Sequence, residues 1–157
     1  MCGAAVFRVP GCRRIPRLMA IIDVAAGLVF RDGKLLITRR HADVHLGGYW
    51  EFPGGKREPE ESFESCLVRE LREELDIEVN VGELIESLTH EYPETTVHLK
   101  FFRCEWKRFE PRALGCSDLQ WVPPEQLAGY SFPPADARLL ERLQKDASIW
   151  GLPNLGG

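Results

Sequence analysis

The stretch GGKREPEESFESCLVRELREEL, residues 54–75, decides the fold of this 157-residue chain. Its first half contains two glycines and a proline and has no apolar periodicity, which predicts a loop. In its second half a phenylalanine or leucine recurs every fourth residue from Phe63 to Leu75. This spacing places the apolar side chains on one side of a helix. The stretch therefore predicts a loop that leads into an amphipathic helix over residues 62–75.

Three carboxylates share one face of this predicted helix. At the helical rotation per residue, Glu70, Glu73 and Glu74 fall within an arc of roughly 100°, at the edge of the apolar side. Like charges at this spacing destabilise a helix by a few tenths of a kcal/mol per pair, and partial burial raises that cost. A bound cation would reverse both effects. Hard oxygen ligands in such a cluster suit Mg²⁺ or Mn²⁺.

A simpler interpretation of the helix competes with a metal site. Helices rich in Glu and Arg are usually solvent-exposed faces with ion pairs, and Arg69 and Glu73 have the spacing of such a pair. The upstream glycines favour a site, because a glycine-rich loop lets backbone groups approach a phosphate or a metal closely. Glu61 adds a further acid next to them. We therefore predict a functional site where this loop meets the helix.

The same residues resemble the signature of the Nudix hydrolase family. Gly55 is followed after five residues by Glu61 and, after seven more, by RELREELDI at residues 69–77. One position departs, since Asp76 stands where the family usually has Gly. That residue follows the helix in a left-handed conformation, which Asp tolerates better than most other residues. No metal ligand is lost by this change.

The resemblance implies a fold of the α/β (α+β) class, a Nudix-type α/β/α sandwich with a mixed β-sheet flanked by helices. The order of the predicted elements fits this fold. An Asp-Gly turn predicts a hairpin between residues 19–30 and 35–39. The remaining predicted strands are residues 77–92, 95–106 and 118–122, followed by a helical turn from Pro124 and a final helix around Leu139, Leu140 and Leu143.

Two further segments are similar to the MutT-like branch of the family, the 8-oxo-dGTP diphosphatases and their near relatives. They are ITRRHADVHLGGYWEFPGGK at residues 37–56 and FPPAD at residues 132–136. The resemblance implies a metal site formed by the Gly54 carbonyl, Glu70, Glu73 and Glu74. It also makes Glu70 the general base and Arg69 a catalytic residue that orients the carboxylates. The positions that match nucleotide contacts in the branch are Arg40, His45, Glu51, Phe52 and Asp136.

Two departures from that branch bear on the substrate. Asp136 stands where relatives carry an Asn that reads the purine edge. An ionised carboxylate only accepts hydrogen bonds, so it would suit an N–H-rich guanine or cytosine edge and be repelled by a carbonyl. Gly115 aligns with an additional metal-associated Glu, for which Glu110 or Asp118 could substitute. The sequence therefore leaves open which nucleobase the substrate carries.

The resemblance implies an Mg²⁺-dependent enzyme, with Mn²⁺ as an alternative, that hydrolyses oxidised or non-canonical nucleoside triphosphates to the monophosphate and pyrophosphate. Glu70 would deprotonate the attacking water. One alternative is a Nudix hydrolase for another diphosphate-linked substrate, such as a nucleotide sugar or a dinucleoside polyphosphate. Another is a non-catalytic base-sensing module, like the MutT-like domain of adenine glycosylases. Such modules lack the full carboxylate set, whereas this chain has Glu61, Glu70, Glu73 and Glu74.

Composition limits the partners. A net charge of −4 argues against a protein that coats nucleic-acid backbones, although a metal-loaded acidic site can still bind nucleotides. No apolar run is long enough to span a membrane. Five cysteines, an odd number without CxxC spacing, indicate reduced thiols in the cytoplasm. We expect a nucleoside triphosphate as the partner, no polymeric nucleic acid and no membrane, and a monomer or homodimer.

Three segments divide the chain. Residues 1–18 contain four Arg and no acid, and we expect a basic, disordered extension there, with Met19 as the natural start. Residues 19–147 form the predicted Nudix hydrolase domain. Residues 148–157 are predicted to be a loose C-terminal tail.

Overall fold

The structure of the protein is a computed structural model that describes residues 20–151. The predicted basic extension, the proposed start at Met19 and the last six residues of the predicted tail lie outside the described residues.

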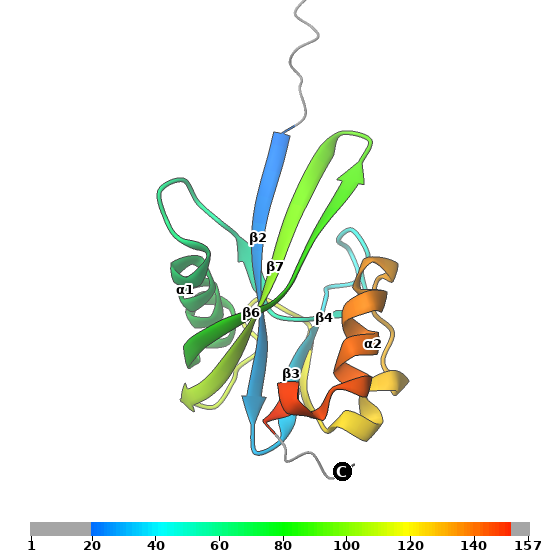
Figure 1. Ribbon diagram of the computed structural model, residues 1–157. Helices are drawn as coiled ribbons and strands as arrows, with labels where there is room; N and C mark the ends of the chain where they lie inside the picture. The colour runs from blue at the N-terminus through cyan, green and yellow to red at the C-terminus, as the bar shows by residue number, and fades with distance from the viewer. Residues whose placement is uncertain (1–19, 152–157) are drawn as a thin grey trace, which may run out of the picture.

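A mixed β-sheet forms the centre of the molecule (Figure 1). Its main path runs β4-β3-β2-β7-β6, with β5 paired to β2 and β8 paired to β3. The pair β2–β7 is parallel, and the other pairs are antiparallel. The strands are β2 (Ala20–Arg31), β3 (Lys34–Arg39), β4 (Trp50–Glu51), β5 (Gly54–Lys56), β6 (Glu78–Tyr92), β7 (Thr95–Arg108) and β8 (Asp118–Val122).

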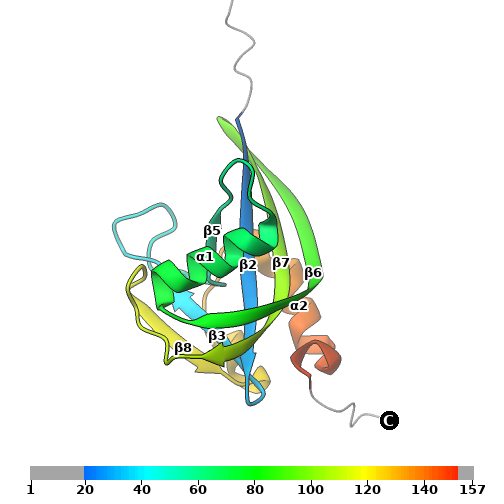
Figure 2. The ribbon, with the colours of Figure 1, turned by 90° about the vertical axis from the view of Figure 1, so that its left-hand side faces the viewer.

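Helices cover both faces of this sheet. Helix α1 (Phe63–Leu75) lies on one side and α2 (Ala137–Lys145) on the other, as Figures 1 and 2 show. Short 3₁₀ helices η2 (Pro124–Gly129), η3 (Pro134–Asp136) and η4 (Ala147–Trp150) surround α2. The predicted three-layer sandwich with a mixed sheet is therefore confirmed. Among residues 20–151, no helix has the combined length and apolar character needed to cross a membrane.

Strand β2 separates two hydrophobic cores. Because successive side chains of a strand point to opposite faces, Ala26, Leu28 and Phe30 join the core under α2, whereas Ala25 and Val29 join the core under α1. The turn after β2 is the predicted Asp-Gly hairpin. Asp32 and Gly33 both have positive φ, at 52° and 75°, as a type I′ turn requires.

Helix α1 follows the predicted pattern closely. Ser62 caps its N-terminus, where its side-chain oxygen accepts a hydrogen bond of 2.9 Å from the Ser65 N–H. Leu67, Leu71 and Leu75 are fully or almost fully buried against the sheet. Asp76 ends the helix in the left-handed conformation, with φ 58° and ψ 35°, as its place in the signature predicts.

The prediction of a loop at Gly54–Lys56 is wrong, because this segment is a short strand paired with β2. Gly54 lies opposite Ala26 and Gly55 opposite Ala25. A Cβ on Gly54 would lie 1.9 Å from the Ala25 carbonyl oxygen, so only glycine allows this approach. Glycine-rich composition signals a loop locally, and the strand exists because β2 supplies the partner.

The prediction of a loose tail from residue 148 is also wrong for residues 148–151. These residues belong to η4 and its C-terminal cap, and Trp150 is only 3% exposed. The Trp150 indole N–H donates to the Leu143 carbonyl at 2.8 Å, and its ring meets the edge of Phe30 at 5.4 Å. The local sequence did not predict the burial of Trp150, because this burial depends on contacts with distant elements.

The described C-terminal turn should therefore contribute to global stability. Trp150→Ala removes a buried aromatic side chain, and we expect it to lower the free energy of unfolding by about 3–5 kcal/mol. Urea denaturation measures this change. Leu114→Ala, at a residue that is 53% exposed, serves as the control and should change stability by less than about 0.5 kcal/mol. Equal stabilities for both variants would show that the turn is not part of the core.

Candidate active site

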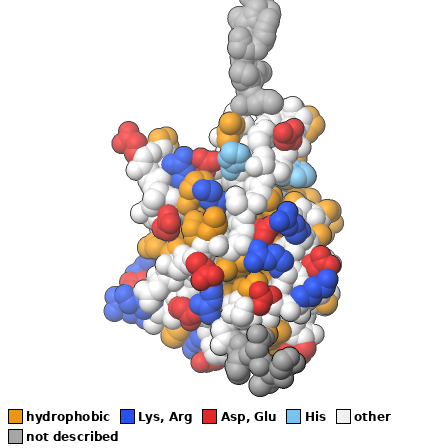
Figure 3. All heavy atoms as spheres, in the orientation of Figure 1, with side chains coloured by type: hydrophobic (Ala, Val, Ile, Leu, Met, Phe, Trp, Pro, Cys, Tyr) orange, Lys and Arg blue, Asp and Glu red, His pale blue; other side chains and the backbone are white. Residues whose placement is uncertain are grey.

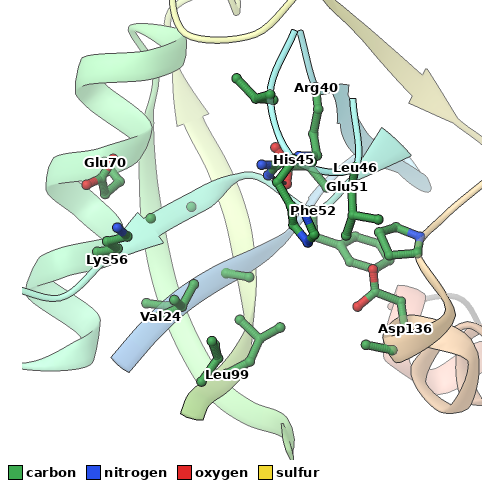
Figure 4. Close-up of a pocket in the computed structure, with 18 of the residues that line it drawn as sticks. Val24, Arg40, His45, Leu46, Glu51, Phe52, Lys56, Glu70, Leu99 and Asp136 are labelled. Atoms are coloured by element: carbon green, nitrogen blue, oxygen red, sulfur yellow. Dashed lines mark hydrogen bonds and ion pairs between the residues drawn. The ribbon is translucent and has the colours of Figure 1, made fainter. Parts of the chain in front are cut away.

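A cavity of about 600 Å³ lies where β2, β5, α1, the loop between β3 and β4, and η3 meet (Figure 4). Eight of the ten predicted site residues line it. They are Arg40, His45, Glu51, Phe52, Gly54, Glu70, Glu74 and Asp136. Residues far apart in sequence therefore share one space, although their individual roles stay predictions.

The other two predicted residues, Arg69 and Glu73, lie outside the lining of the cavity. The Glu73 side chain is 59% exposed and pairs with Arg69 at 3.3 Å. This is the ordinary i,i+4 ion pair that the competing interpretation of the helix expects. The metal-ligand role of Glu73 remains a prediction.

Arg69 holds the carboxylates beside the cavity in a fixed arrangement. Its guanidinium donates to both oxygens of Glu61 at 3.1 and 2.7 Å, and to Glu70 Oε2 at 3.1 Å. Its hydrogen bonds are the main reason that the pKa of Glu61 falls to about 2. A further hydrogen bond of 3.2 Å reaches the Lys56 carbonyl on β5. Arg69 thus contacts Glu61 and Glu70 from outside the cavity lining, and its role in catalysis stays a prediction.

Two glycines leave room for the carboxylates of α1. A Cβ on Gly55 would lie 2.3 Å from Glu70 Cδ, and a Cβ on Gly115 would lie 2.9 Å from Glu74 Cγ. Both side chains therefore lie close to backbone that carries no side chain of its own. The Leu114 and Gly115 N–H groups both donate to the Glu74 carbonyl at 3.0 Å, which fixes that end of the helix.

Burial destabilises the ionised form of several carboxylates in this cavity. Burial raises the pKa of Glu74 to about 7, and the charges of Glu70, Glu51 and Glu73 add to the increase. Burial also raises the pKa values of Glu70 and Glu51, against the opposing effects of Arg69 and Arg40. A positive charge placed among these side chains would remove the conflict.

The donor set fits a divalent cation. Carboxylate and carbonyl oxygens are the hard ligands that Mg²⁺ and Mn²⁺ prefer, and Gly54, Glu70 and Glu74 bring them to one cavity. Within residues 20–151, no three His, Cys, Asp or Glu side chains are already gathered closely enough to hold an ion. The oxygens would therefore have to draw together around it.

The far end of the cavity is apolar with one buried acid. Figure 4 shows Asp136, beside α2, across the cavity from Glu70 on α1. Asp136 is only 6% exposed, and burial raises its pKa to about 6, with Glu51 as the second cause. The Phe52 ring stacks on Phe132 at 5.0 Å. This end suits a flat ring that presents polar atoms to Asp136.

The loop between β3 and β4 forms a wall between these two ends. Arg40 Nη1 pairs with Glu51 at 2.9 Å, and Arg40 Nε donates to the His45 carbonyl at 2.8 Å. The His45 ring meets the edge of Tyr92 with centroids 6.0 Å apart. Arg40 thus ties the loop to β4, and Tyr92 meets it from β6.

Sequence reasoning missed several residues of the lining. Lys56 follows the glycine pair directly, so its position beside the motif could have indicated it. Tyr92 and Leu99 come from the β6–β7 hairpin and carry no motif, since only the sheet topology brings them to the cavity. Whether Glu110 or Asp118 substitutes for the Glu that aligns with Gly115 stays open. Glu110 pairs with Arg31 at 2.8 Å and Asp118 caps the Leu119 N–H, and neither lines the cavity.

The three-layer fold and the carboxylate-lined cavity between a glycine strand and α1 together define a Nudix domain. A family model described as the NUDIX domain matches residues 25–142, so the chain belongs to the Nudix family and is a Nudix hydrolase. Hydrolases of this family generally use a divalent metal ion.

The chain is also similar to individual proteins of this family. It is 42% identical to the CTP pyrophosphohydrolase of Escherichia coli (strain K12), over 78% of this chain and 91% of the relative. It is 34% identical to the 8-oxo-dGTP diphosphatase of the same strain, over 81% of this chain and 99% of the relative. The solution structure of the E. coli ORF135 protein superimposes with a TM-score of 0.68 at 41% identity, covering 78% of this chain and 88% of that one.

A methyl group at Gly55 should damage the site without damaging the fold. Gly55→Ala would push the Glu70 carboxylate from its place, and a displacement of this kind costs about 10- to 100-fold in turnover. Hydrolysis kinetics and thermal unfolding measure the two effects. Gly129→Ala is the matched control, because its Cβ meets nothing within 4 Å. Full activity of Gly55→Ala would show that the position of Glu70 is unimportant.

Proposed function

We propose that this protein is an Mg²⁺-dependent nucleoside triphosphate pyrophosphohydrolase that releases a nucleoside monophosphate and pyrophosphate. The observation that carries the proposal is that the two ends of one cavity differ in chemical character. At one end the charge of Glu70 raises the pKa of Glu74. The other end is apolar and contains the buried Asp136. A polyphosphate with its metal ions fits the first end, and a nucleobase fits the second.

The metal would be held by Glu70, Glu73, Glu74 and the Gly54 carbonyl. When bound, Mg²⁺ or Mn²⁺ supplies positive charge to the phosphates and lowers the pKa of a bound water. Glu70 would accept a proton from that water, and this role is supported by burial, which raises the pKa of Glu70 and so increases its basicity. Arg69 keeps the Glu70 carboxylate in one orientation through the hydrogen bond of 3.1 Å.

Basic groups along the wall of the cavity would bind the phosphates. Lys56 lies next to Glu70, and Arg40 and His45 lie between the carboxylate end and the base end (Figure 4). On the face shown in Figure 3, acidic and basic side chains are intermixed. This distribution supports a small nucleotide, rather than a polymeric nucleic acid, as the substrate.

Asp136 would select the base. As an anion it only accepts hydrogen bonds, so it favours an edge with N–H donors, such as the amino group of cytosine or the N–H groups of guanine. The name of the relative at 42% identity, a CTP pyrophosphohydrolase, supports a cytosine nucleotide. The name of the relative at 34% identity supports an oxidised guanine nucleotide as the second candidate.

A panel of nucleotides tests this function. CTP, dCTP, oxidised dCTP, dGTP, 8-oxo-dGTP and a nucleotide sugar are incubated with Mg²⁺, and monophosphate, pyrophosphate and phosphate are measured separately. We expect pyrophosphate from cytosine or oxidised guanine triphosphates. Glu74→Gln should lower turnover by about 100-fold or more, because it removes a ligand charge. Glu64→Gln, at an exposed position of the same helix, should leave turnover unchanged.

Three results would contradict the proposal. Full activity of Glu74→Gln would contradict the assignment of Glu74 as a metal ligand. Failure to cleave any triphosphate, combined with nucleotide binding, would favour the non-catalytic base-sensing module, and cleavage of the nucleotide sugar alone would favour that class of substrate.

A further inference from the structure

One guanidinium joins three elements next to the site. Arg57 lies in the loop between β5 and α1, and its Nε and Nη2 atoms donate to Asp23 Oδ2 on β2 at 3.3 and 2.7 Å. Its Nη1 atom donates to the Glu61 carbonyl at 2.8 Å. The guanidinium also lies over the ring of Phe63, the first residue of α1, at 5.2 Å. The guanidinium therefore contacts β2, the loop and the first residue of α1.

The pair with Asp23 is anchored in the sheet. The side chains of Asp23 and Arg57 are only 22% and 28% exposed, so their attraction is less screened than that of a surface pair. The other oxygen of Asp23 lies 3.5 Å from His98 Nδ1 on β7. The Arg57 N–H donates to the Asp23 carbonyl at 2.8 Å, which fixes the backbone of the loop as well.

A continuous series of short contacts leads from this pair to the cavity. Arg57 holds the Glu61 carbonyl, and both carboxylate oxygens of Glu61 hold Arg69. Arg69 in turn donates to Glu70 at 3.1 Å. The orientation of the Glu70 carboxylate therefore depends on where the loop places Glu61.

We propose that Arg57, seated on Asp23, is a positioning residue that sets the geometry of the carboxylate face through Glu61 and Arg69. This inference rests on the proposed metal-dependent function. Position 57 is one of the five variable positions between Gly55 and Glu61 in the signature, and Asp23 lies outside the signature. Lysine cannot replace Arg57, because an ammonium does not offer three donors in the fixed planar arrangement that reaches both partners.

The test measures metal binding separately from turnover. Mn²⁺ is titrated calorimetrically into Arg57→Gln, Arg57→Lys and Asp23→Asn in the absence of nucleotide, and kcat and KM are measured with the best nucleotide. Loss of a group that orients a metal ligand typically costs about 10- to 100-fold in affinity or activity. For Arg57→Gln we expect about tenfold weaker Mn²⁺ binding and about tenfold lower kcat, with KM changed by less than about twofold.

The variants show whether Arg57 and Asp23 act through one series of contacts or affect the site independently. Arg57→Lys should behave like Arg57→Gln. The double variant Arg57→Gln/Asp23→Asn should be no worse than Arg57→Gln alone, since both substitutions break one series of contacts. Arg108→Gln is the matched control, because it breaks an equally short ion pair of 2.8 Å, with Glu78, away from the cavity. It should leave Mn²⁺ affinity and kcat unchanged.

Wild-type Mn²⁺ affinity and kcat in folded Arg57→Gln would overturn the inference, even if the variant melts at a lower temperature, and so would additive effects in the double variant. If Arg57→Gln does not fold, the isosteric Asp23→Asn decides alone, and unchanged metal affinity and kcat in that variant would overturn the inference. If the wild-type protein binds no Mn²⁺ and cleaves no nucleotide, the proposed function itself fails.

Discussion

The conflict among carboxylates on α1 is the constraint on which the rest of the site depends. Glu70 and Glu74 lie against backbone at positions where no side chain fits, and burial, with neighbouring carboxylates as a further cause, raises their pKa values. A fold gains nothing from this arrangement by itself, since like charges destabilise a helix. Under the proposed function, a bound cation would neutralise these charges, and it would lie where a polyphosphate could reach it.

The surrounding elements keep this face in place. The glycine strand β5 is paired with β2, and α1 packs on the same strand from one side through Leu67 and Leu71. On the other side of the sheet, α2 brings Asp136 to the apolar end of the same cavity. One strand, β2, thus supports both the carboxylate end and the apolar end, so their separation is set by the sheet.

The local parts of this arrangement could be predicted from the sequence. The spacing of leucines gives α1, Asp76 occupies the predicted left-handed position, and Asp32 and Gly33 form the predicted hairpin turn. The parts that depend on distant partners could not be predicted. Strand β5 needs β2, Trp150 needs Phe30 and Leu143, and the contact of Arg57 with Asp23 spans 34 residues.

The pH dependence of stability tests the central claim most directly. Because the pKa of Glu74 is raised from 4.5 to about 7 in the fold, the folded state keeps this proton more strongly than the unfolded chain, and stability is lost as pH rises through that interval. Thermal unfolding of the wild-type protein and Glu74→Gln is measured with chelator and with Mg²⁺, at about pH 5 and about pH 8. The wild-type midpoint should fall relative to Glu74→Gln as pH rises, and Mg²⁺ should restore it mainly at pH 8. A difference between the two proteins that is independent of pH, with no response to Mg²⁺, would contradict the account.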